Sequence, residues 1–252
     1  MKKYDKRYSK NYVAKLIAVL KMLFQYAVDH GYLIKNPAEK LKKQEEKNTV
    51  TTFWTEEEMN KFLKVAKEYA YYPAFLLALS CGCRKGEILG MTWDAIDFDN
   101  CIVNIKQILT NDGKKLENKA KNQQSIRSIK IPSNVIEELR VFKQEFDEKK
   151  RTLKGNFAKY NLVVSSKNGA PVSPRNISRT MDIIIKKPGV PRITFHSLRH
   201  THATLLMQKG VNMKVVSERL GHSDIRTTMN RYTHVAPTLQ EEAAEIIGSL
   251  IK

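Results

Sequence analysis

Residues 194–234 read TFHSLRHTHATLLMQKGVNMKVVSERLGHSDIRTTMNRYTH and hold five of the six histidines of the chain. Thr194 can cap the start of a helix, and the glycines at positions 210 and 221 can interrupt the helical pattern that follows. This stretch therefore predicts consecutive helices that carry histidine, arginine and tyrosine side chains within one short part of the chain.

The spacing of these histidines raises the question of a metal site. His196 and His200 lie four residues apart, so both would share one helix face. Position 197 is serine, however, so the HExxH pattern of zinc proteases is absent, and the three cysteines show no C-x-x-C spacing. The glycines form neither of the phosphate-binding patterns G-x-x-x-x-G-K-[ST] and G-x-G-x-x-G. We therefore expect no metal, no nucleotide and no other cofactor.

The composition of the chain favours a polyanionic partner. Its 252 residues include 44 Lys+Arg and 26 Asp+Glu, a net charge of +18, and 42% are hydrophobic, enough for a folded core. The longest uncharged stretch, residues 69–83, is shorter than the roughly 20 apolar residues of a membrane-spanning helix. Three cysteines do not make a disulfide scaffold. We expect a soluble nucleic-acid-binding protein of the reducing cytoplasm.

The first part of the chain shows helical patterns. Apolar residues recur with helical spacing between Asn11 and His30, where Ser9 can cap the helix and Gly31 can end it. Thr55 and the glutamates after it form a capping box, and helices are predicted from there to about residue 91. One long helix with a short partner cannot enclose a core, so we expect the first unit to be either the tail of a helical domain whose beginning is missing or a unit that leans on something else.

The apolar period then changes to that of strands. Residues 101–108 and 125–131 predict two strands of a small antiparallel sheet, connected through Asn111-Asp112-Gly113 and a lysine-rich stretch. Pro132-Ser133 predicts the start of another helix, and residues 162–164 predict a further short strand. The expected fold class is α+β, mainly α.

A protein that breaks a DNA phosphodiester without a metal needs a particular set of side chains. Arginines suit the charge that builds on the nonbridging phosphate oxygens, because their planar fork donates paired hydrogen bonds. A lysine can protonate the leaving 5′ oxygen, a histidine can relay a proton, and tyrosine can attack and later leave as a phenolate.

The chain holds these side chains in a recognisable order. SCGCRKGE at residues 80–87 precedes the strands, His196-x-x-Arg199 follows, and LGHS at residues 220–223 stands shortly before Tyr232. This set closely resembles the tyrosine recombinase (phage integrase) family, and is most like the integrases of conjugative transposons and temperate phages. The resemblance implies a tyrosine recombinase fold, a helical catalytic domain with a small antiparallel sheet, and a site-specific recombinase that integrates or excises a mobile element without metal or ATP.

The resemblance also implies a domain organisation. Residues 1–47 resemble the C-terminal part of a helical core-binding domain, residues 48–52 a linker, and residues 53–252 a whole catalytic domain with a tail helix from about 237. The polar stretch 39–52 also fits the frayed end of a helix. We expect that the first domain lacks its beginning and that a full integrase would carry an arm-binding domain ahead of it.

For the phosphate, the resemblance implies a clamp formed by Arg84 and Arg199. His222 would donate a hydrogen bond to the same phosphate, and Glu87 would be a buried organiser of Arg84. Each residue also has a structural alternative: Arg84 could satisfy carbonyls at a helix end, and His222 could be a turn residue.

For the proton transfers and the covalent step, the resemblance implies Tyr232 as the nucleophile and His196 as its general base. A lysine shortly before the strand arginine Arg127 would be the general acid; Lys121 fits best, and Lys119 is the alternative. Tyr232 is one of ten tyrosines and could instead simply pack. Residues expected to be structural only are His200, His202, Cys81 and Cys83.

The implied partners are double-stranded DNA and three further copies of the chain, as a homotetramer on paired DNA sites. The tail after residue 237 would dock on a neighbouring protomer, although it could also pack on its own domain. An excisionase or a DNA-bending host factor is a further expected partner, and a membrane is not. Two other functions remain open: a type IB topoisomerase-like DNA relaxer and a catalytically silent DNA-binding protein.

Overall fold

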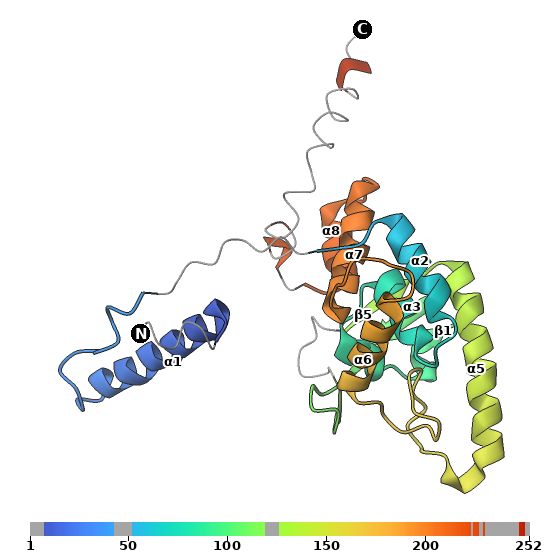
Figure 1. The fold of residues 1–252 in the computed structure, drawn as a ribbon, viewed down its shortest axis with the longest axis horizontal. Helices are drawn as coiled ribbons and strands as arrows, with labels where there is room; N and C mark the ends of the chain where they lie inside the picture. The colour runs from blue at the N-terminus through green and yellow to red at the C-terminus, as the bar shows by residue number, and fades with distance from the viewer. Residues whose placement is uncertain are drawn as a thin grey trace. The chain divides into compact units, whose positions relative to one another are not determined.

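The computed structural model describes residues 8–42, 52–118, 126–222, 224–226, 229 and 247–249. The chain divides into two compact units, Met1–Thr51 and Thr52–Lys252 (Figure 1). Of the predicted linker, residues 48–52, only Thr52 lies in the described part, and of the predicted tail only residues 247–249 do. No helix in the described part of the chain is long and apolar enough to cross a membrane.

The first unit consists of α1 (Lys10–Asp29) and a short return segment. The hydroxyl of Ser9 accepts a hydrogen bond from the backbone N–H of Tyr12 at 3.2 Å, and Gly31 follows the helix with a φ of 74°. The side-chain amide of Asn36 donates back to the carbonyl of Lys21 at 3.0 Å. These ends confirm the sequence prediction for this helix.

Most large apolar side chains of α1 are exposed. Ile17 is buried, whereas Leu16, Leu20 and Leu23 are at least 40% exposed. One helix and its return segment therefore enclose almost no core of their own, as the sequence predicts.

The second unit begins with three helices. The capping box predicted at Thr55 is present at the start of the first. The hydroxyl of Thr55 accepts from the N–H of Glu58 at 3.2 Å, and the carboxylate of Glu58 accepts from the N–H of Thr55 at 2.8 Å. The helices are α2 (Glu56–Ala66), α3 (Tyr72–Cys81) and α4 (Lys85–Leu89), followed by the 3₁₀ turn η1 (Trp93–Ala95).

Two small antiparallel sheets follow these helices. The first has the order β1-β2-β5 and the second pairs β3 with β4. Their strands are β1 (Ile96–Asp97), β2 (Ile102–Ile105), β3 (Gln107–Leu109), β4 (Leu116–Asn118) and β5 (Arg127–Lys130). In the first sheet Val103 lies opposite both Ile96 and Ile129, so buried apolar residues face one another across its three strands.

The strand predicted over residues 101–108 is in fact two strands, β2 and β3, which belong to different sheets. The reason is tertiary. The side-chain amide of Gln107 donates to the carbonyl of Gly90 at 2.6 Å, and a Cβ on Gly90 would lie 2.6 Å from the carbonyl carbon of Ile108. The backbone of β3 therefore packs directly on the end of α4, which draws it away from the line of β2.

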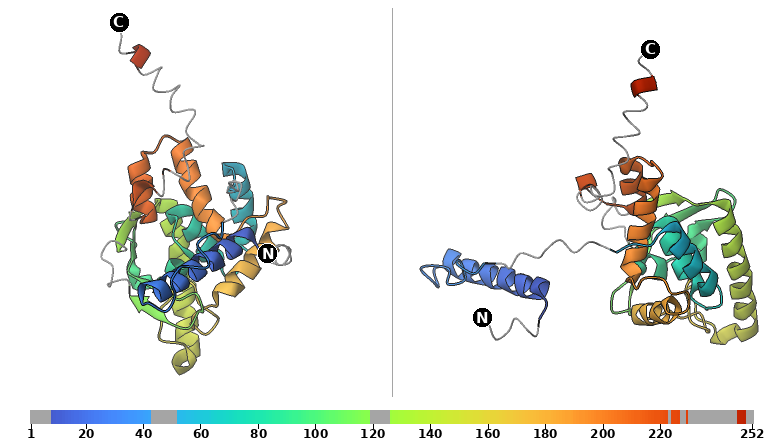
Figure 2. Two further views of the ribbon diagram at one scale, coloured as in Figure 1. Left: turned by 90° about the vertical axis from the view of Figure 1, so that its left-hand side faces the viewer. Right: turned by 45° about the horizontal axis from the view of Figure 1, so that its top comes forward.

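The remaining helices complete the core. They are α5 (Ser133–Leu153), α6 (Pro174–Ile185), α7 (Phe195–Gln208) and α8 (Met213–Leu220), with the 3₁₀ turn η4 (Lys154–Asn156) after α5. All residues of α3 except Ser80 are buried, because the helix packs against α2, α4, α5 and α7. Helices α7 and α8 lie side by side, and α5 runs along another side of the domain (Figures 1 and 2).

The structure differs from the sequence predictions in two further places, residues 162–164 and helix α6. Residues 162–164 form only an isolated bridge between Leu162 and Thr92, because the partner segment around Met91 is irregular and offers no strand. Helix α6 was not predicted, although Ser173 caps its first turn and proline occupies its first position. The fold is otherwise the predicted one, mainly helical with small antiparallel sheets.

Candidate active site

The site forms where the C-terminal ends of α3 and α8 meet. Each helix ends in a glycine with left-handed backbone angles: Gly82 after α3 has a φ of 65°, and Gly221 after α8 has a φ of 66°. The last carbonyls of a helix have no partner within the helix, and they carry partial negative charge. Two such ends that face each other need donors from elsewhere in the chain.

At the end of α3, three side chains supply these donors. His202 in α7 donates from Nδ1 to the carbonyl of Leu79 at 2.7 Å. Arg219 in α8 donates to the carbonyl of Ser80 at 3.2 Å. Arg199 in α7 donates from Nη1 to the carbonyl of Gly82 at 2.6 Å.

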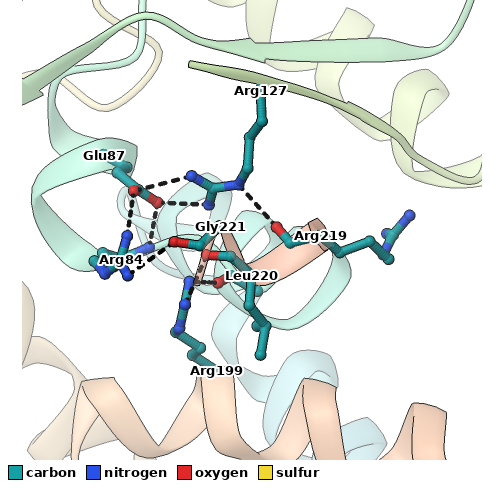
Figure 3. A network of polar contacts seen from close by, with 8 residues as sticks. Arg84, Glu87, Arg127, Arg199, Arg219, Leu220 and Gly221 are labelled. Carbon is teal, nitrogen blue, oxygen red and sulfur yellow. Dashed lines mark hydrogen bonds and ion pairs between the residues drawn. The ribbon is translucent and has the colours of Figure 1, made fainter. Parts of the chain in front are cut away.

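At the end of α8, three arginines perform the same task for successive carbonyls (Figure 3). Arg127 in β5 donates from Nε to the carbonyl of Arg219 at 2.8 Å. Arg199 donates from Nη2 to the carbonyl of Leu220 at 2.7 Å, and Arg84 donates from Nη2 to the carbonyl of Gly221 at 3.3 Å. The two arginines of the predicted phosphate clamp therefore converge on adjacent peptide groups.

Glu87 is the acidic centre of this cluster, and only 1% of its side chain is exposed. Its carboxylate accepts from Arg84 twice, from the backbone N–H at 2.8 Å and from Nη1 at 3.1 Å. Arg127 binds both oxygens of the same carboxylate, with Nη1 at 3.1 Å from Oε1 and Nη2 at 2.9 Å from Oε2. The predicted contact between Glu87 and Arg84 is present, and Arg127 is a second partner that the sequence did not indicate.

The charges of the cluster leave an excess of positive potential. Burial, together with the neighbouring charges of Arg84 and Arg127, lowers the pKa of Arg199 to about 10, so its guanidinium remains charged at neutral pH. Burial is the largest single influence on Arg127 and opposes its charge, but the hydrogen bonds and charge attraction to Glu87, together with nearby Cys83 and Cys81, raise the pKa of Arg127. Three guanidinium groups around one carboxylate form a site for an anion.

The two predicted histidines, His196 and His222, lie before and after Arg199 and Arg219 in the chain. His196 is exposed in the first turn of α7, where the Thr194 hydroxyl accepts from the N–H of Ser197 at 3.2 Å, and its ring meets that of His200 edge-on at 4.8 Å. His222 is half-buried and follows Gly221 directly; its backbone N–H donates to the carbonyl of Ser217 at 3.1 Å. The turn after α8 thus sets the position of His222 next to the clamp.

Some predicted site residues lie outside the described part of the chain: the nucleophile Tyr232 and both lysine candidates, Lys121 and Lys119. Within the described residues, no group of three or more histidine, cysteine or acidic side chains could hold a metal ion. The residues expected to be structural are buried: His200, His202, Cys81 and Cys83.

Sequence reasoning missed two arginines of the cluster, Arg127 and Arg219. In the sequence, Arg127 only marked the position of the lysine that precedes it. Its local pattern indicates no more than a charged residue in a short strand. Arg219 donates to the carbonyls of Lys130 and Ser80, which lie far from it in the sequence. Local patterns carry no information about such pairs.

Comparison with known proteins identifies the family. A model of the phage integrase family matches residues 52–238. The chain belongs to the phage integrase family. A XerC-like tyrosine recombinase of Caldanaerobacter subterraneus is 35% identical to this chain. The match covers 98% of this chain and 69% of the relative. The transposase of transposon Tn916 from Enterococcus faecalis is 32% identical over 85% of this chain and 56% of its own length. This integrase family member thus spans only part of the curated relatives it matches.

Solved structures of integrases share its fold. The Tn1549 transposon integrase, in complex with a circular intermediate DNA, superposes with a TM-score of 0.79 at 21% identity, over 95% of this chain and 81% of that one. A lambda integrase dimer bound to a core site superposes with a TM-score of 0.66 at 19% identity, over 91% of this chain and 76% of that one. The fold described above is therefore the tyrosine recombinase fold.

Proposed function

We propose that this chain is the DNA-joining part of a site-specific recombinase that integrates or excises a mobile element. The observation that carries the proposal is the convergence of Arg84 and Arg199 on the adjacent carbonyls of Gly221 and Leu220, directly before His222. A scissile phosphate at this position would receive guanidinium donors from two directions and the imidazole of His222 from a third. Relatives from transposon Tn916 and from the mobile element ICEBs1 support the mobile-element role.

The proposed reaction exchanges one phosphodiester for another. The phenolic oxygen of Tyr232 forms a bond to the phosphorus while the bond from phosphorus to the 5′ oxygen breaks, which leaves a 3′-phosphotyrosyl link and a free 5′ hydroxyl. His196 accepts the tyrosine proton, and Lys121 or Lys119 protonates the 5′ oxygen. Attack by a 5′ hydroxyl on the phosphotyrosine reverses these steps. Because the bond type is kept, the exchange needs no ATP.

The arginines take the place that a metal ion holds in other phosphoryl-transfer enzymes. Charge on the nonbridging oxygens grows in the pentacovalent transition state, and fixed donors in a partly buried site stabilise it. Arg199, with 3% of its surface exposed, has its orientation fixed by two carbonyls, so it does not need to reorganise during the reaction. We therefore propose a metal-independent mechanism.

We propose that several copies of the chain assemble on DNA. The lambda integrase structure is a dimer on a core site, and we propose a homotetramer on two paired DNA sites for this chain. Residues 1–47 would act as the end of a core-binding domain, residues 48–52 as a linker and residues 53–252 as the catalytic domain, with the tail from about 237 docking on a neighbouring protomer. An excisionase or a bending factor would join the complex.

A covalent-trapping assay tests the proposal. The protein is incubated in EDTA with nicked duplexes that carry ends of candidate mobile elements, and adducts that survive denaturant are resolved on gels. We expect an adduct at particular sequences, its loss in Tyr232→Phe, and its retention in the control Tyr160→Phe, which changes an exposed tyrosine. Equal adducts on every duplex, with relaxation of supercoiled plasmid, would instead indicate a topoisomerase-like relaxer. DNA binding without any adduct would contradict the proposed chemistry.

A further inference from the structure

The two arginines that share Glu87 differ in their surroundings. The side chain of Arg127 is 9% exposed and binds both carboxylate oxygens, at 3.1 and 2.9 Å. The side chain of Arg84 is 44% exposed, and its guanidinium binds only one oxygen of the same carboxylate, at 3.1 Å. The guanidinium of the buried arginine therefore makes more contacts with Glu87 than that of Arg84, whose side chain remains partly open to solvent.

A buried carboxylate must be paired with a cation, because its isolated charge is costly in a protein interior. If Arg127 were neutral, Arg84 would be a cation within the described part of the chain that already makes two contacts to Glu87. Its guanidinium would then turn inward to bind both carboxylate oxygens, and less of its charge would face an incoming phosphate.

Arg127 also connects this carboxylate to the end of α8. Its Nε donates to the carbonyl of Arg219, and a Cβ on Gly221 would lie 2.8 Å from its Nη1. The guanidinium therefore contacts Glu87 on one edge and the turn that leads to His222 on the other. A single side chain therefore joins the carboxylate that Arg84 contacts to the turn before His222.

We infer that Arg127 is a positioning residue that binds Glu87 so that Arg84 remains available for the phosphate, and that holds the turn before His222 in place. This inference rests on the proposed function, since it assigns a phosphate to Arg84. A positioning role for Arg127 differs from a merely structural ion pair in one respect. The defect caused by removing Arg127 should be partly relieved by also removing the charge of Glu87.

The first experiment measures the availability of Arg84 without any catalysis. The rate at which phenylglyoxal modifies Arg84 is followed by mass spectrometry in the whole protein. In Arg127→Gln we expect this rate to fall by about ten-fold, as for one added charge-assisted hydrogen bond. In the double variant Arg127→Gln with Glu87→Gln the rate should return toward the wild-type value. An unchanged rate in Arg127→Gln, or a double variant as slow as the single one, would overturn the inference.

The second experiment measures covalent trapping on the preferred duplex. Arg127→Gln should trap on the order of 100-fold more slowly, as when a preorganised donor to the transition state is lost. The double variant should recover part of this loss, because the two sites are coupled. If the double variant traps more slowly than Arg127→Gln alone, the ion pair is structural only. If the wild-type protein forms no adduct, the proposed function fails, whereas the modification rates still decide the inference.

Two further variants keep the inference testable if Arg127→Gln does not fold. Arg127→Lys keeps the positive charge beside Glu87, so the modification rate of Arg84 should stay close to wild type even if Arg127→Gln does not fold. Arg140→Gln is the matched control, because Arg140 also joins a carboxylate, that of Glu137, to a backbone carbonyl, that of Phe98. Slower modification of Arg84 in this control or in Arg127→Lys would count against the inference.

Discussion

His202 in α7 donates a hydrogen bond from Nδ1 to the carbonyl of Leu79 in α3, across 2.7 Å. A Cβ on Gly82 would lie 2.6 Å from the Cδ2 of this ring, so the glycine is what allows the imidazole to reach the end of α3. The other ring nitrogen, Nε2, is buried and has no hydrogen-bond partner. The ring thus joins two helices as a neutral group, three residues from Arg199.

This burial predicts a pH-dependent stability. Burial lowers the pKa of His202 from 6.5 to about 4, so the unfolded chain takes up the proton first as the pH falls. Stability is therefore fully present above pH 6.5 and is lost toward pH 4, with a slope of at most about 1.4 kcal/mol per pH unit. Urea unfolding between about pH 5 and pH 7.5 measures this slope. His202→Gln keeps an N–H donor and does not titrate, so its profile should be shallower; parallel profiles would contradict the assignment.

Gly221 should tolerate alanine less well than Gly210. Both have positive φ, 66° and 75°, so either alanine carries backbone strain of about 1 kcal/mol. Around Gly210 nothing lies within 4 Å of an added Cβ, whereas at Gly221 the Cβ would meet the guanidinium of Arg127 at 2.8 Å. Gly221→Ala should therefore unfold at lower urea than Gly210→Ala and should also trap DNA more slowly. Equal stability of the two variants would show that the Arg127 contact carries no constraint.

Arg199→Lys should impair both folding and cleavage. The fork of Arg199 donates to the carbonyls of Gly82 and Leu220 at once, and an ammonium group on a flexible stem does not reproduce that geometry. We expect a loss of about 1–3 kcal/mol in the free energy of unfolding, because one buried carbonyl loses its donor, and slower trapping. Arg192→Lys is the control, since the side chain of Arg192 is 80% exposed. Wild-type unfolding and trapping in Arg199→Lys would contradict the bridging role.

Thr55→Ala should separate stability from chemistry. The loss of the capping box at the start of α2 should lower the free energy of unfolding by about 1 kcal/mol. Thr55→Ser retains the hydroxyl and should stay near wild type. Trapping rates per folded molecule should not change in either variant, because this cap is not part of the arginine cluster; a trapping defect in Thr55→Ala would place the start of α2 in the site.

Local sequence patterns predicted the parts of this fold that depend on neighbouring residues. Ser9 caps α1 and Gly221 ends α8 as predicted, because capping joins residues within one turn. The prediction of one continuous strand over residues 101–108 was wrong. The division into β2 and β3 depends on Gly90 at the end of α4, which is distant in the sequence. Helix α6 was missed although its cap is local.

The sequence by itself determined the family resemblance, the ends of α1, the start of α2, the end of α8 and the side chains available for the reaction, since residue types and local spacing suffice for these. Only the tertiary structure decided how the charges are shared. Arg127 meets Glu87 across 40 residues and Arg199 meets Gly82 across 117, distances over which local preferences have no influence. These contacts arise because two helix ends are buried together, and buried carbonyls and carboxylates must find donors wherever the fold brings them.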